Sequence, residues 1–140
     1  MCSSDLMKPL RREVNRRYKD IDLDMMVHPH TDDIVGRYDD EALTGSILNI
    51  IKTRKGERVF NPDFGSNVYN SLFEPMTSTT RITLEAQIEN ALHQHEPRIN
   101  LNFVKIIGDE ERNAYNVTIG YSPVSGGGIR EVEFFLNRLR

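Results

Sequence analysis

The residues whose types and spacing could do chemistry are concentrated between residues 53 and 65, in the segment TRKGERVFNPDFG. It carries charged side chains at Arg54, Lys55, Glu57, Arg58 and Asp63. Its glycines permit backbone conformations closed to other residues, and its proline fixes the chain where it turns. A loop of this composition could catalyse a reaction, bind a partner or hold a fold together.

A second motif, Glu96-Pro97-Arg98, offers this loop a structural role. Glu96 ends an apolar-faced helix and Arg98 starts the turn toward the first long strand, so both charges need partners if they are partly buried. We therefore predict a charge latch between the loop and the helix end, formed by Lys55, Glu57, Arg58, Glu96 and Arg98. We predict that the loop takes its conformation from Gly56, Pro62, Phe64, Gly65 and Pro97.

Metal and cofactor chemistry finds little support in the sequence. His28, His30, Asp32 and Asp33 supply suitable atoms, but their spacing fits no established site and an exposed proline-bearing loop is poorly preorganised. The single cysteine, Cys2, excludes a tetrathiolate zinc site. We predict no metal and no cofactor.

Catalytic motifs are equally weak. The chain lacks a Gly-x-Ser-x-Gly nucleophile elbow, and the glycines at 126–128 lack the lysine of a phosphate loop. With 21 Asp and Glu residues, some carboxylate pair can always be proposed for glycoside hydrolysis. The candidates Glu41, Glu57, Glu74 and Glu96 lie in settings typical of structural residues. We predict no catalytic residue.

Composition favours one modest domain of 140 residues. The net charge of −3 argues against a dedicated nucleic-acid binder, and no apolar run approaches the roughly 20 residues that span a bilayer. The first residues lack the apolar core of a signal peptide, and one cysteine fits a reducing cytoplasm.

Helical periodicity dominates the first hundred residues. Leu10, Val14 and Tyr18 recur at four-residue spacing and predict a short helix over 9–18, within a basic arm at 1–18 that precedes a single domain at 19–140; a solvated, fraying arm is the alternative. Residues 19–39 read as an extended surface segment. Longer helices are predicted from Asp39 or Asp40 to Gly56 and from the hydroxyl-rich segment 76–80 to Glu96, with a short one within 66–73.

The period changes from 3.6 to 2 after Asn100, which predicts strands at 101–107, 115–121 and 129–139. Polar loops at 108–113 and 125–128 separate them. The expected fold is therefore α+β: two main helices plus a short N-terminal helix, followed by a three-stranded antiparallel sheet.

Five motifs in order carry a family resemblance: Tyr18-Lys19-Asp20-Ile21-Asp22; Ile50-Ile51-Lys52-Thr53; Lys55-Gly56-Glu57-Arg58 with Pro62 and Phe64-Gly65; Leu72-Phe73-Glu74; and Glu96-Pro97-Arg98. Together they resemble the small baseplate wedge protein of contractile-tailed bacteriophages, in a lysozyme-like family that also contains the sheath-initiating baseplate component of type VI secretion systems. The resemblance spans roughly residues 18–139.

The resemblance implies a non-enzymatic subunit of the virion tail baseplate, assembled in the host cytoplasm. Its implied partners are the larger baseplate wedge proteins and the tail sheath protein, with tail tube or hub proteins as further candidates and no membrane or nucleic acid. The last strand, with Ile129, Val132, Phe134 and Leu136, is expected to dock sheath through its open edge. Leu10, Val14 and Tyr18 are expected to contact wedge helices. Because some family members have been called lysozymes, a peptidoglycan-degrading tail enzyme is the alternative.

Overall fold

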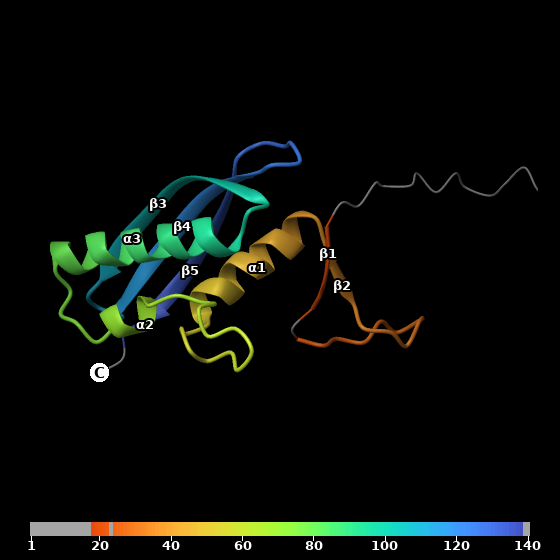
Figure 1. The fold of residues 1–140 in the computed structure, drawn as a ribbon, viewed down its shortest axis with the longest axis horizontal. Helices are drawn as coiled ribbons and strands as arrows, with labels where there is room; N and C mark the ends of the chain where they lie inside the picture. The colour runs from red at the N-terminus through yellow and green to blue at the C-terminus, as the bar shows by residue number, and fades with distance from the viewer. Residues whose placement is uncertain (1–17, 23, 139–140) are drawn as a thin grey trace, which may run out of the picture.

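The computed structural model describes residues 18–22 and 24–138 (Figure 1). The predicted helix at 9–18 therefore lies outside the described residues, except for Tyr18. A small hairpin of β1 (Lys19–Ile21) and β2 (Gly36–Tyr38) comes first, where the sequence predicted only an extended segment. It lies beside the start of α1 (Asp40–Lys52).

Helix α1 forms where its periodicity predicts, and Leu43, Ile47, Ile50 and Ile51 are buried. Its end differs from the prediction, because the helix stops at Lys52 rather than Gly56. Thr53 turns to extended backbone and its carbonyl accepts a hydrogen bond from the Ser66 amide at 2.9 Å. Pairing across the loop therefore replaces further helical turns.

The next helices are α2 (Val68–Ser71) and α3 (Ser78–His95). The Thr77 hydroxyl caps α3 by accepting from the Thr80 amide at 3.2 Å. The helix ends immediately before Glu96-Pro97, since a residue that precedes proline avoids the helical region. Residues Leu84, Ile88, Ala91 and Leu92 of α3 are buried, as their spacing predicts.

Three antiparallel strands complete the chain in the order β3-β4-β5: β3 (Ile99–Asp109), β4 (Ala114–Pro123) and β5 (Arg130–Asn137). Figure 1 shows α3 running across the sheet, and β4 directs Tyr115, Val117, Ile119 and Tyr121 into the core. The predicted α+β class is confirmed. In the described part of the chain, no helix is long and apolar enough to cross a membrane.

Candidate functional site

An ion pair between a buried carboxylate and a partly exposed guanidinium lies where α3 turns into β3. The Arg98 guanidinium donates hydrogen bonds to both Glu96 carboxylate oxygens, with Nε 2.6 Å from Oε1 and Nη2 2.8 Å from Oε2. Such a bidentate pair is strong and fixes geometry. The Ser46 hydroxyl, from the middle of α1, donates to the same carboxylate. The cluster therefore ties α1 to the end of α3.

The two charges differ in their exposure. The Glu96 side chain is only 2% exposed, whereas that of Arg98 is 34% exposed. Burial alone raises the pKa of Glu96, but hydrogen bonds from Arg98 and Ser46 and the charge of Arg98 outweigh burial, so the net pKa is lowered. The hydrogen bond with Glu96 raises the pKa of Arg98. A carboxylate held charged in this way suits a structural role better than proton transfer.

The loop reaches the end of α3 differently from the predicted latch. Among the described residues, no ion pair joins Lys55, Glu57 or Arg58 to Glu96 or Arg98. Arg98 and Ser46 already satisfy the buried carboxylate, and this removes the need for a charge from the loop.

Aromatic contacts connect the loop to α3 instead. The Arg58 guanidinium lies 4.4 Å from the centre of the Phe64 ring, and the Phe64 and His95 ring centres are 5.1 Å apart. A second cation, Arg54, lies 4.4 Å from the Tyr69 ring centre. Stacking of this kind contributes about 0.5–1 kcal/mol at exposed sites. Cation–π and aromatic contacts, in place of the predicted ion pairs, therefore connect the loop to α2 and α3.

The predicted conformational residues Gly56, Gly65 and Pro97 lie where the backbone bends or turns. Gly56 has φ 85° and its amide donates to the Pro62 carbonyl at 2.8 Å. Gly65 has φ 113°, and a Cβ there would be only 2.5 Å from the Thr53 carbonyl oxygen. Pro97 is exposed at the turn between α3 and β3. Glycine at 65 is therefore required both by conformation and by space.

Strand β5 pairs with β4 and forms one edge of the sheet. In this strand, which we expect to dock sheath through its open edge, Val132, Phe134 and Leu136 point into the core and are buried. Because side chains alternate along a strand, the opposite face carries Glu131, Glu133 and Phe135. Ile129 is exposed and precedes the strand. A partner at this edge would meet backbone groups and the second set of side chains.

The predicted wedge-contacting arm is described only at Tyr18, and Leu10 and Val14 lie outside the described residues. Tyr18 is half-buried and its amide donates to the Asp39 carboxylate at 3.1 Å. The Arg98 guanidinium lies 5.4 Å from its ring centre. Tyr18 therefore belongs to the folded body.

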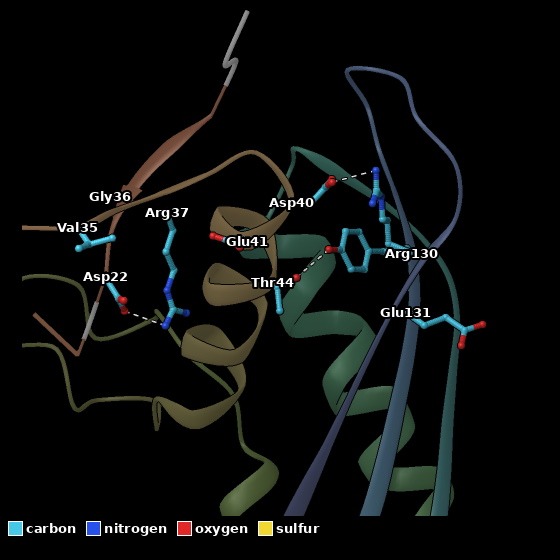
Figure 2. A pocket seen from close by; sticks show the side chains of 10 residues that line it. Asp22, Val35, Gly36, Arg37, Asp40, Glu41, Thr44, Arg130 and Glu131 are labelled. Atoms are coloured by element: carbon cyan, nitrogen blue, oxygen red, sulfur yellow. Dashed lines mark hydrogen bonds and ion pairs between the residues drawn. The ribbon is translucent and has the colours of Figure 1, made fainter. Parts of the chain in front are cut away.

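A groove of about 560 Å³ lies between the hairpin, α1 and the start of β5. Figure 2 shows two of its carboxylates engaged by arginines: Arg37 lies 2.7 Å from Asp22, and Arg130 lies 2.9 Å from Asp40. Two further carboxylates are exposed there, and Figure 2 shows Glu41 and Glu131 pointing in different directions rather than toward each other. Glycoside hydrolysis needs an acid and a second carboxylate facing the same bond.

The histidine-rich turn does not assemble into a metal site. The His28 and His30 ring centres are 5.8 Å apart, but the residues that the structure describes contain no group of three or more His, Cys, Asp or Glu able to hold a metal ion.

Two contributors escaped sequence reasoning. Ser46 donates a hydrogen bond to the Glu96 carboxylate, and the His95 ring contacts the Phe64 ring of the loop at an interplanar angle of 52°. A lone serine or histidine in a helix gives no sequence signal of a distant partner. The packing of α1 against α3 brings Ser46 to Glu96, and the fold of the loop brings Phe64 to His95.

Comparisons with known proteins agree with this structural reading. A family model described as baseplate wedge protein gp25 matches residues 37–125. Baseplate wedge protein gp25 of Enterobacteria phage T4 is 39% identical over 94 residues, which are 67% of this chain and 70% of that protein.

Solved structures show the same fold. A putative tail lysozyme from Geobacter sulfurreducens aligns with a TM-score of 0.68 and 28% identity, over 72% of this chain and 92% of that one. A chain of the anti-feeding prophage baseplate aligns with a TM-score of 0.61 and 20% identity, over 88% and 87%. The resemblance found in the sequence is confirmed, and the chain belongs to the baseplate wedge protein gp25 family of contractile tail systems.

Proposed function

We propose that this protein is a non-catalytic docking subunit of the baseplate wedge, and that it starts sheath polymerisation by accepting a sheath strand at the free edge of β5. It is held in the wedge by larger wedge proteins and reaches the virion tail after assembly in the host cytoplasm. The position of β5 at the edge of the sheet carries the proposal.

The edge is well suited to strand addition. An edge strand presents unpaired N–H and C=O groups to a neighbouring chain. Buried Val132, Phe134 and Leu136 anchor β5 to the core, so its backbone is fixed before a partner arrives. The other edge strand, β3, has a register irregularity between Leu101 and Phe103, and because such bulges make an edge less suited to pairing, this favours β5 as the docking edge.

Hydrogen exchange tests the proposal directly. The purified full-length chain is mixed with the sheath protein of the same particle, and backbone exchange is followed by mass spectrometry. We expect slower exchange in peptides that cover residues 130–137, with peptides of β3 unchanged. Protection confined to β3, or no protection on mixing, would contradict docking at β5. Deleting β5 is a poor test because it removes core side chains.

The enzymatic alternative draws on the tail lysozyme similarity and on the carboxylates of the groove. Ion pairing of Asp22 and Asp40 and the divergent directions of Glu41 and Glu131 weigh against it. The turbidity of a peptidoglycan suspension measures this hydrolytic activity. Clearing by the wild-type chain that a Glu41→Gln/Glu131→Gln variant loses would establish the enzyme and overturn the non-catalytic reading.

A further inference from the structure

The loop between α1 and α2 carries an apolar tip that no role above uses. Val59 and Phe60 are 87% and 101% exposed, and Phe60 is the most exposed large apolar side chain in the described part of the chain. Burying such a side chain is worth about 1.5–3 kcal/mol. Two adjacent apolar side chains fully in water therefore offer binding energy that the isolated fold leaves unused.

The loop holds this tip in one conformation. The Gly56 amide donates to the Pro62 carbonyl across the loop at 2.8 Å. The Arg54 amide donates to the Glu57 carboxylate at 3.0 Å, and the Arg58 and Phe64 side chains stack at the base. Because the backbone is already ordered, a partner that captures the tip loses little conformational entropy in doing so.

The charges beside the tip indicate the chemistry of the partner. Lys55 and Arg58 are both exposed, and neither forms an ion pair with another described residue. The Glu57 carboxylate is engaged by a backbone amide within the loop. A complementary surface would place carboxylates around an apolar pocket, since opposite charges at an interface steer association and select the partner.

We propose that Val59 and Phe60 form an anchor that inserts into an apolar pocket, rimmed by carboxylates, on a larger baseplate wedge protein. This inference rests on the proposed function, which places the chain among such proteins. A membrane is the less favoured surface. Inserting two apolar side chains into it would gain about 3–6 kcal/mol, which is comparable to the marginal, reversible binding given by a single lipid anchor. A buried aromatic in a protein pocket is a typical binding hot spot.

Co-purification tests the anchor. The full-length chain is co-expressed with the larger wedge proteins of the same particle, and binding is then measured with purified components. Phe60→Ala should weaken binding about 30-fold or more, and Phe60→Asp further. Thermal unfolding of both variants should match wild type, because Phe60 packs against no core. Phe73→Asp, at a 61% exposed phenylalanine beyond α2, is the matched control and should bind normally.

The outcomes separate the two proposals. If wild type and both Phe60 variants bind equally, or if Phe73→Asp weakens binding as much, the anchor is wrong and the wedge function stands. If wild type binds no wedge protein, both fail. Sedimentation with anionic phospholipid vesicles that depends on Phe60 would overturn the protein pocket in favour of a membrane. A photoreactive phenylalanine analogue at position 60 should crosslink to a wedge protein, whereas the same analogue at position 73 should not.

Discussion

Removing either partner of the Glu96–Arg98 pair should destabilise the fold, but by different amounts. Arg98→Met leaves a carboxylate that is 2% exposed with Ser46 as its remaining side-chain partner. Breaking a buried pair in this way costs about 3–5 kcal/mol.

Glu96→Gln is milder for two reasons. The amide keeps the shape of the carboxylate and leaves no buried charge behind. Its single oxygen still accepts one hydrogen bond from Arg98, but its NH2 group faces the other Arg98 donor, so one of the two bonds is lost at about 1.5–3 kcal/mol. Arg98, which is 34% exposed, remains partly hydrated. We expect a total cost of about 2–3 kcal/mol. The double variant should cost less than the sum of the single ones by about 1–3 kcal/mol, since one substitution already removes the interaction.

The pH dependence follows from the directions of the pKa shifts. In the wild type the lowered pKa of Glu96 contributes stability that is complete above its ordinary value of 4.5 and is lost as pH falls through the folded-state pKa. In Arg98→Met, burial without the arginine raises the pKa of Glu96. Acidification therefore protonates the unpaired carboxylate and removes the free-energy cost of burying its charge. The stability gap between wild type and Arg98→Met should therefore narrow between pH 7 and pH 4.

Urea unfolding followed by circular dichroism measures these free energies, with equal m-values as the check that one transition is compared. Equal losses in the two single variants, strict additivity, or a gap that does not change with pH would each refute the assignment of a buried, coupled ion pair.

Further substitutions probe the packing. Gly65→Ala should lower the free energy of unfolding by more than about 3 kcal/mol, because its Cβ would be 2.5 Å from the Thr53 carbonyl oxygen. Gly56→Ala has open space around it and should lower the same free energy by only about 1 kcal/mol. Equal losses of stability in urea unfolding would contradict this reasoning. Tyr115→Phe should be neutral or stabilising by up to about 1 kcal/mol in thermal unfolding, since the Tyr115 hydroxyl is buried and has no hydrogen-bond partner among residues 18–22 and 24–138. A loss above about 1 kcal/mol would contradict this reasoning. Gly120→Ala should destabilise by about 1–3 kcal/mol, because the Phe103 ring would be 2.2 Å from the added Cβ. Adding Phe103→Ala should recover part of that loss, and a simple sum of the two costs would show that the residues do not touch.

Local periodicity determined most of the fold. The four-residue spacing of apolar side chains located α1 and α3, and strict alternation located β4 and β5. These patterns are visible in sequence because each element must turn one face to a common core. The β1–β2 hairpin was missed, since strands of three residues are too short for alternation to show.

The candidate site depended on contacts between distant residues. Glu96 and Arg98 could be paired from the sequence because they are two positions apart. The hydrogen bond from Ser46 to the same carboxylate depends on the packing of α1 against α3. With that carboxylate satisfied, the loop bound α3 through Phe64 and His95 instead.

The same division holds at the sheet edge and the loop. Alternation along the last strand was evident in the sequence, yet only the completed sheet decided that Val132, Phe134 and Leu136 face the core. The charges of the loop were equally plain, but exposure of Phe60 at its tip follows from a backbone closed by contacts across the loop. Sequence determined which side chains alternate or repeat, because that is a local property. Tertiary structure decided which of them are buried, paired or left for a partner, because burial depends on what packs against each face.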